Sequence, residues 1–195
     1  MKSILYALFI ILFLSGCAGF SNKMVMGNKK TVSDFNLKTF EGLYALFPDS
    51  SYDKKGKPQL IETLESKSMY NLNYFVKSHK AKYDYSESYT VELKAAGQNR
   101  MKFITQKDNV KIDSIELGGE LKKDGFFYLD NTYLKSNGVP YLAGGYTNYK
   151  TRIGLTKDNG LLVHYAYDNS GALLFMFWAG STYNLGYHYK KIENK

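Results

Sequence analysis

The residues that could support catalysis or bind a metal are few, and their spacing matches no common catalytic motif. The three histidines, His79, His164 and His188, form no His-Glu-x-x-His pattern, and the single cysteine has no second thiol with which to build a zinc site. A serine nucleophile would need a Gly-x-Ser-x-Gly turn, which the sequence does not contain. We therefore predict no catalytic residue, no metal site and no cofactor.

One group of carboxylates begins like a calcium loop. Asp49, Ser51 and Asp53 have the first three ligand spacings of such a loop. Lys54 then occupies the position where a glycine makes the sharp turn, and Leu60 the position of the closing bidentate glutamate. The segment is therefore predicted to be a solvated loop.

A basic stretch, "VKSHKAKYDY", carries four basic side chains. Lys77, His79, Lys80 and Lys82 can form a cationic rim that attracts the phosphates of lipopolysaccharide or of anionic lipid. The alternative is a solvated loop or an edge strand whose lysines discourage aggregation. We expect no nucleic-acid partner.

Tyrosines are concentrated in the last strands of the chain. Tyr183, Tyr187 and Tyr189 fall on one face of the predicted strand "TYNLGYHYKKI". A tyrosine ring is apolar and its hydroxyl seeks water or a polar partner, so tyrosines suit the mouth of a cavity or an exposed concave face. We predict that these three residues border a binding surface.

The only cysteine follows a short apolar run at the start of the chain. The run from Ile4 to Leu14 has the length of a secretory signal, and it ends in Leu14-Ser15-Gly16-Cys17. This segment resembles the signal peptides of bacterial lipoproteins, whose lipobox is an aliphatic residue, a small residue, Gly or Ala, and Cys. The resemblance implies removal of residues 1–16 and acylation of Cys17, which becomes the membrane anchor.

The same resemblance gives an expected location. Ala18 stands where an aspartate tends to retain proteobacterial lipoproteins in the inner membrane, so the outer membrane is favoured if the source is a diderm bacterium. In other bacteria, the protein would be lipid-anchored at the cell surface. Small and polar residues dominate up to residue 33, so residues 17–33 are predicted to be a flexible tether.

The remaining residues, 34–195, are predicted to form a single β domain. Aromatic residues make up 16% of the chain, and "YTVELKA" alternates with the period of a half-buried strand. Paired turn residues then divide the chain at 108–109, 124–125, 137–138, 159–160 and 170–171. The prediction is mainly β: an antiparallel meander forming a small barrel or a strongly curved sandwich, with one or two short helices near the N-terminus.

Three segments carry more detailed expectations. Residues 60–64 are predicted to form a short helix, and a strand is expected near residues 69–76. The segment 172–180, "ALLFMFWAG", is apolar on both faces and is predicted to be a strand covered on both sides. The segment "FEGLYALF" is loosely similar to the entry into a lipocalin barrel, with Tyr44 in place of the tryptophan of Gly-x-Trp.

Three function classes remain open at this point. The absence of a catalytic pattern and the many tyrosines favour a binding module for lipid, glycan or an envelope protein. The second class is a structural or assembly lipoprotein without a ligand pocket. The third is an enzyme acting on the cell wall, which would need two opposed carboxylates.

Overall fold

The computed structural model describes residues 18–31, 36–77, 79–139, 143–173 and 177–193. The elements in chain order are α2 (Asn22–Val25), the 3-10 turn η1 (Leu37–Phe40), β1 (Gly42–Ala45), β2 (Ser50–Tyr52), β3 (Pro58–Leu60), α3 (Leu64–Met69), α4 (Leu72–Val76), β4 (Tyr89–Ala95), β5 (Arg100–Lys107), β6 (Val110–Leu121), β7 (Phe127–Leu129), β8 (Tyr133–Val139), β9 (Ala143–Leu155), β10 (Leu161–Leu173), β11 (Phe177–Tyr189) and β12 (Lys191–Ile192). Residues 1–16 and Cys17 lie outside the described residues. Of the helices in the described part of the chain, none has the length and apolar run needed to cross a membrane.

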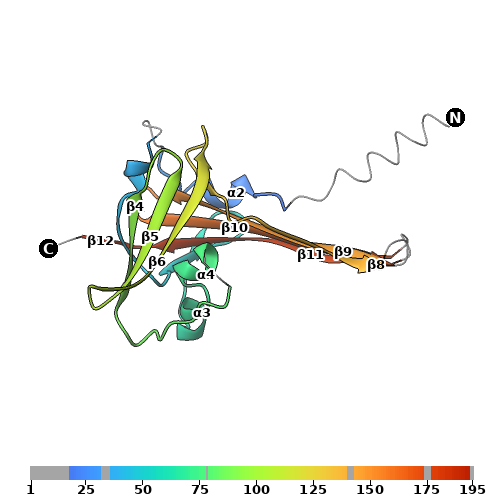
Figure 1. Ribbon diagram of the computed structural model, residues 1–195, viewed down its shortest axis with the longest axis horizontal. Helices are drawn as coiled ribbons and strands as arrows, with labels where there is room; N and C mark the ends of the chain where they lie inside the picture. The colour runs from blue at the N-terminus through green and yellow to red at the C-terminus, as the bar shows by residue number, and fades with distance from the viewer. Residues whose placement is uncertain (1–17, 32–35, 78, 140–142, 174–176, 194–195) are drawn as a thin grey trace.

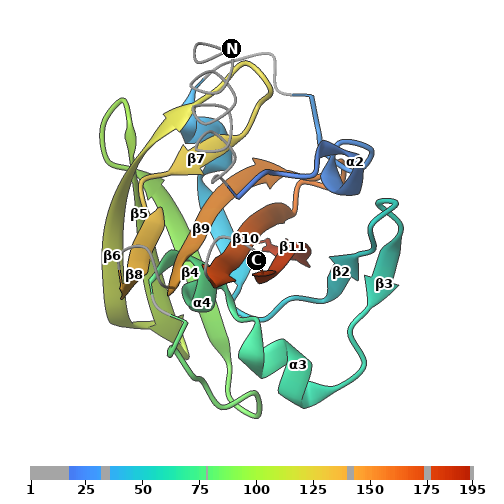
Figure 2. The same ribbon diagram turned by 90° about the vertical axis from the view of Figure 1, so that its right-hand side faces the viewer.

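The strands form one curled antiparallel sheet, a half-barrel, which confirms the predicted mainly β, antiparallel fold. The order of the strands is β12-β1-β4-β5-β6-β7-β9-β10-β11-β2-β3, with β8 added to β9. β12 follows β11 after Lys190 and pairs with β1, so it joins the two sides of the curl. Figure 2 shows the strands curling around the interior, viewed from the side of the arm. β8 to β11 extend beyond the curled body as a long arm (Figure 1).

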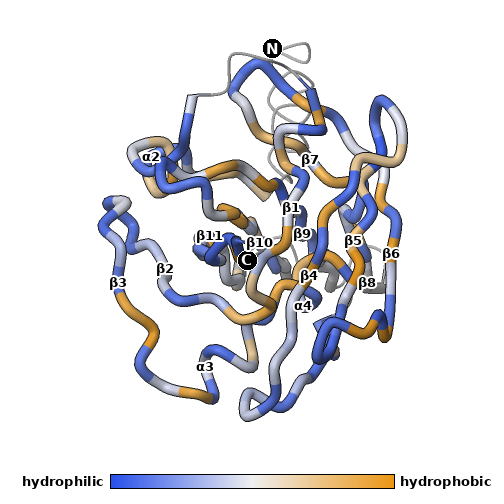
Figure 3. The backbone as a smooth tube through the Cα atoms, turned by 90° about the vertical axis from the view of Figure 1, so that its left-hand side faces the viewer, coloured by the Kyte–Doolittle hydropathy of each residue, from blue (hydrophilic) through white to orange (hydrophobic). Residues whose placement is uncertain are grey.

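Alternation with a period of two sets the inner and outer faces of the strands. Along β5, Met101 and Phe103 are buried while Lys102 is partly exposed, and hydrophobic and hydrophilic residues alternate along the tube in Figure 3. The β5–β6 hairpin closes at Asp108 and Asn109, whose φ angles of 49° and 65° suit the tight turn that the sequence predicted.

The inside of the curl is filled by side chains of the sheet and of α4. Phe75 of α4 lies with its ring centroid 5.5 Å from the ring centroids of both Tyr165 and Tyr187. Polar contacts hold the helix in place: Asn71 accepts a hydrogen bond from the Tyr74 backbone N–H, and Asn73 Nδ2 donates to Thr105 Oγ1 over 2.7 Å. The half-barrel therefore has a packed aromatic core.

Three local predictions were wrong, because contacts distant in sequence outweigh local patterns. The short helix expected at residues 60–64 begins only at residue 64, as α3. The strand expected at 69–76 is replaced by α4, whose Phe75 packs into the sheet. The segment 172–180 is no single strand, since Leu173 of β10 pairs with Phe177 of β11. The turns expected at 137–138 and 170–171 lie inside β8 and β10, where the ladders to β9 and β11 continue.

The segment 18–31 packs on the sheet and forms no tether over those residues. Met24 and Val25 of α2 are buried against Tyr52 and Leu162. Gly186 makes room for them, since a Cβ at that position would lie 3.3 Å from the Val25 side chain. Burial of these apolar side chains fixes the position of the segment on the sheet, which its largely polar composition did not predict.

Replacing Phe75 with Ala tests whether α4 belongs to the core. We expect the free energy of unfolding to fall by about 3–5 kcal/mol, because a buried ring leaves a cavity. The control Leu64→Ala, on the exposed side of α3, should change it by at most about 0.5 kcal/mol. Urea denaturation measures both. A loss below about 1 kcal/mol for Phe75→Ala would contradict the packing described here.

Candidate functional site

Four tyrosines form one row across the four strands of the arm, at its junction with the body. The register pairs Tyr133 with Tyr149, Tyr149 with Tyr167, and Tyr167 with Tyr183. The rings of Tyr133 and Tyr149 stack with centroids 5.0 Å apart, and those of Tyr167 and Tyr183 with centroids 4.7 Å apart. The two outer members, Tyr133 and Tyr183, are each 39% exposed. The row is therefore an aromatic strip that is accessible at both ends.

His79 packs between Tyr149 of the row and Tyr74 of α4. The His79 ring centroid lies 4.4 Å from that of Tyr149 and 4.6 Å from that of Tyr74. Burial lowers the pKa of His79, which favours the neutral imidazole at neutral pH. His79 therefore belongs to an aromatic cluster and not to a cationic rim.

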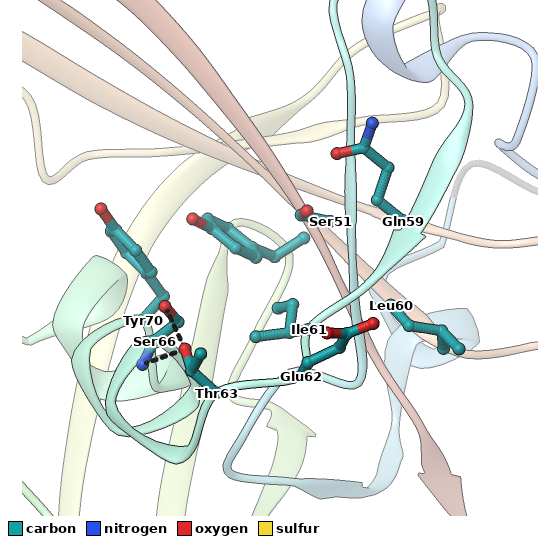
Figure 4. A pocket seen from close by; sticks show the side chains of 9 residues that line it. Ser51, Gln59, Leu60, Ile61, Glu62, Thr63, Ser66 and Tyr70 are labelled. Atoms are coloured by element: carbon teal, nitrogen blue, oxygen red, sulfur yellow. Dashed lines mark hydrogen bonds between the residues drawn. The ribbon is translucent and has the colours of Figure 1, made fainter.

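The aromatic strip continues toward an open cleft of about 330 Å³. Tyr74 packs edge-on against Tyr70, and Tyr70 stacks on Tyr187 with centroids 4.9 Å apart. Figure 4 shows how side chains from β2, β3 and the start of α3 surround the cleft. The polar and aromatic side chains that line it are Ser51, Gln59, Glu62, Thr63, Ser66, Tyr70 and Tyr187. We call the row, Tyr74 and this cleft together the tyrosine surface.

The phenol groups of Tyr149, Tyr183 and Tyr187 stay protonated at neutral pH. Burial, with the nearby Tyr74 and Tyr167, raises the pKa of Tyr183 to about 12. Burial also raises the pKa of Tyr149 and of Tyr187. At neutral pH these side chains are therefore uncharged rings whose hydroxyls can donate and accept hydrogen bonds.

The three predicted tyrosines occupy different depths. Tyr183 lies at the exposed end of the row, and Tyr187 lines the cleft with little of its surface exposed. Tyr189 is fully buried, and its hydroxyl donates a hydrogen bond to the Tyr70 carbonyl over 2.7 Å. The prediction that Tyr189 borders a surface was therefore wrong, because its end of β11 is covered by the segment that precedes α4.

The predicted basic side chains do not share one site. Lys77 forms an ion pair with Asp113 of β6. Lys80 and Lys82 are exposed, while His79 is enclosed by tyrosines. The predicted cationic rim is therefore not formed as one site: Lys77 is ion-paired, His79 lies in an aromatic cluster, and Lys80 and Lys82 lie in the segment before β4.

A buried polar cluster on the outer face of the sheet was missed by sequence reasoning. Arg152 of β9 is 1% exposed and is the direct cross-strand partner of His164 of β10. Its guanidinium donates to Asp124, to the Tyr128 hydroxyl and to the Asn22 side chain. Burial and the charge of Arg152 lower the pKa of His164 to about 3. One signal was available in the sequence: both residues sit at outward positions of strands that are otherwise rich in apolar side chains.

A second polar cluster surrounds His188. Its Nδ1 lies 2.6 Å from Asp49 Oδ1, and its Nε2 lies 3.2 Å from Asp158 Oδ2. Gly160 permits this approach, since a Cβ there would lie 2.0 Å from His188 Nε2. The cluster ties the chain before β2 and the β9–β10 turn to β11, which makes it a structural ion-pair group.

Among the described residues, neither the second hollow nor any metal site offers an alternative to the tyrosine surface. A hollow of about 630 Å³ lies between η1, the β4–β5 turn and the end of β6, and the described residues that line it include no aromatic residue and none of the predicted site residues. Within the described ranges, no group of three or more His, Cys, Asp or Glu side chains is arranged to hold a metal ion. The tyrosine surface is therefore the candidate site.

No family model, no curated protein and no solved structure matches the chain. The site therefore stands on the geometry of this chain alone.

The pH dependence of stability should report the cluster around His188. Burial by itself lowers the pKa of His188, but its hydrogen bond to Asp49 and the charges of Asp49 and Asp158 outweigh burial and leave the pKa raised above 6.5. The protonated histidine then stabilises the fold fully below about pH 6.5, and this contribution is lost as the pH rises through the folded pKa. The two aspartates, whose pKa values are lowered, contribute above about pH 3.8.

We therefore expect His188→Gln to lower the melting temperature more at pH 6 than at pH 8.5. His79→Gln is the matched control, because the pKa of His79 is shifted the other way and the variant should show no such pattern. Thermal unfolding of both variants at each pH measures the difference. An equal loss for His188→Gln at both pH values would contradict the ion-pair account.

Proposed function

We propose that this protein is a non-catalytic binding module of the bacterial envelope, anchored by lipid at Cys17, that binds glycan on the tyrosine surface. The observation that carries the proposal is the aligned row from Tyr133 to Tyr183, which is partly exposed and continues into a cleft lined by hydroxyl and amide groups. Rigid rings with polar tips offer both a stacking face and hydrogen bonds.

The polarity of the cleft favours glycan over anionic lipid. Among the described residues that line it, Glu62 is the only charged side chain, so an anionic headgroup would meet no cation there. Ser51, Gln59 and Thr63 offer donors and acceptors of the kind that sugar hydroxyls pair with. A neutral, hydroxyl-rich ligand therefore suits this lining best.

The same lining favours binding over hydrolysis. A glycosidase needs two carboxylates on either side of the scissile bond, and Glu62 is the one carboxylate among the described residues of the cleft. Tyr187 of the cleft, whose pKa is raised by burial, does not replace the second carboxylate, because it remains a weak acid and a weak base near neutral pH.

A structural or assembly role is the second candidate, and the arm is the observation that favours it. β8 to β11 project from the body (Figure 1), and Leu134 of β8 is 66% exposed on the arm. In that case the arm would bind an envelope partner, and the stacked tyrosine row would stabilise the junction between the arm and the body.

Replacing Tyr183 with Ala should weaken glycan binding at least about tenfold, which corresponds to about 1.4 kcal/mol. Calorimetric titration with soluble peptidoglycan fragments and with lipopolysaccharide core oligosaccharide measures the affinity. Tyr146→Ala is the matched control, because Tyr146 lies on the same sheet but on the opposite face. Unchanged affinity in Tyr183→Ala, or no binding of either glycan by the wild type, would contradict glycan binding on this surface.

Replacing Cys17 with Ser should abolish lipidation, because the acyl group is carried on the cysteine thiol. Metabolic labelling with a clickable fatty acid should mark the wild type and leave Cys17→Ser unlabelled. Ser15→Ala is the control: it keeps a small residue in the lipobox and should retain the label. Equal labelling of the wild type and Cys17→Ser would contradict the anchor.

A further inference from the structure

The first described residues of the chain are held on the outer face of β9, β10 and β11 by a specific set of contacts. Asn184 of β11 makes two of them: its Oδ1 accepts a hydrogen bond from the Ser21 backbone N–H over 2.8 Å, and its Nδ2 donates to the Gly19 carbonyl over 3.0 Å. One side chain thus holds the backbone on both sides of Phe20. Ala18, the residue before this pair, is fully buried.

The buried guanidinium of Arg152 holds the same segment from a second side. Its terminal nitrogen donates to Asn22 Oδ1 over 2.7 Å, and its central carbon lies 4.5 Å from the centre of the Phe20 ring. The Phe20 ring also lies 5.0 Å from the His164 ring. A guanidinium shielded from water is stable when such acceptors and rings surround it, so the segment completes the environment of Arg152.

His164 connects the two holding groups. Its Nδ1 faces the Arg152 guanidinium, and its Nε2 lies 2.9 Å from Asn184 Oδ1. In the neutral form, Nδ1 accepts from Arg152 and the Nε2 proton points at Asn184. Arg152, His164 and Asn184 therefore act as one hydrogen-bonded unit against residues 18–22.

These holding groups and the tyrosine surface lie on opposite faces of the same strands. Along β10, His164 points outward while Tyr165 and Tyr167 point inward, and along β11 Asn184 alternates with Tyr183 in the same way. The N-terminal segment on the outer face therefore lies on the side of the sheet opposite the tyrosine surface.

We propose that residues 18–22, held by Arg152, His164 and Asn184, form an anchor clamp that seats the domain directly on the membrane with the tyrosine surface turned away from it. The inference rests on the lipid anchor of the proposed function. Cys17 is one peptide unit from the buried Ala18, about 3.8 Å between Cα atoms. A flexible tether of residues 17–33 would instead have a reach of about 20–25 Å.

The side chains beside the anchor clamp suit a bilayer with anionic headgroups. The Lys150 ammonium lies 5.3 Å from the centre of the Phe20 ring, and the Lys122 ammonium lies 4.4 Å from the centre of the Tyr128 ring. Each lysine near an anionic surface adds to the attraction. Lys150 thus places positive charge on the outer face of β9, next to the point where the acyl chains would begin. Lys122 lies beside β7 and also forms an ion pair with Glu120 over 3.4 Å.

Amide hydrogen exchange of the full-length lipidated protein in detergent micelles tests the anchor clamp. The amides of Ser21, Met24 and Met26 should be protected, since each donates a hydrogen bond. Asn184→Ala should raise the exchange rate of Ser21 about tenfold, the effect of losing one or two hydrogen bonds. Asn169→Ala, an exposed asparagine of β10, is the matched control and should leave these rates unchanged. Rapid exchange of residues 19–26 in the wild type would overturn the anchor clamp.

Amine labelling of the lysines in membrane vesicles tests the orientation. Lys150 should react several-fold more slowly in the membrane-bound wild type than in soluble Cys17→Ser, whereas Lys111 of the β5–β6 hairpin should react equally in both. Equal reactivity of Lys150 in the two proteins would overturn the seating on the membrane. Fatty-acid labelling separates the two proposals. If the wild type is labelled but the amides of residues 19–26 exchange rapidly, only the anchor clamp is contradicted. If the wild type is unlabelled, the lipid anchor itself is contradicted.

Discussion

The unbroken register of β9, β10 and β11 decides which side chains can act together. Leu161 to Leu173 of β10 pair without a shift with both neighbouring strands, so every side chain of one row faces the same side. Because the side-chain period of a strand is two, a slip of one residue would move the tyrosines outward and Arg152 into the core. Both the tyrosine surface and the anchor clamp depend on this one alignment.

Burial of Arg152 links the N-terminal segment to the sheet. A guanidinium withdrawn from water is costly unless hydrogen-bond acceptors surround it. Here Asp124 of the β6–β7 turn, Tyr128 of β7, His164 of β10 and Asn22 accept from it. Residues 18–22 of the segment are held by Arg152 and Asn184, and the residues that follow are held by the burial of Met24 and Val25. Each part therefore stabilises the other, which explains why a polar stretch lies fixed on the sheet.

The parts of the fold that depend on neighbouring residues were predictable from the sequence. The alternation of Val91 and Leu93 predicted β4, and Asp108-Asn109 predicted a turn, because strand period and positive φ are local properties. α4 was missed because its formation depends on Phe75 packing into a sheet built by distant strands. Tyr189 was misplaced for a similar reason, since alternation gives the face of a strand but not which end another segment covers.

Nuclear Overhauser contacts between side chains of the two faces test the central claim most directly. We expect cross-peaks between the rings of Tyr167 and Tyr183, whose centroids lie 4.7 Å apart, together with cross-peaks between the rings of Phe20 and His164, whose centroids lie 5.0 Å apart. Loss of both sets, with contacts from Tyr183 to Asp168 in their place, would indicate a register shifted by one residue. That result would contradict the alignment on which the tyrosine surface and the anchor clamp both depend.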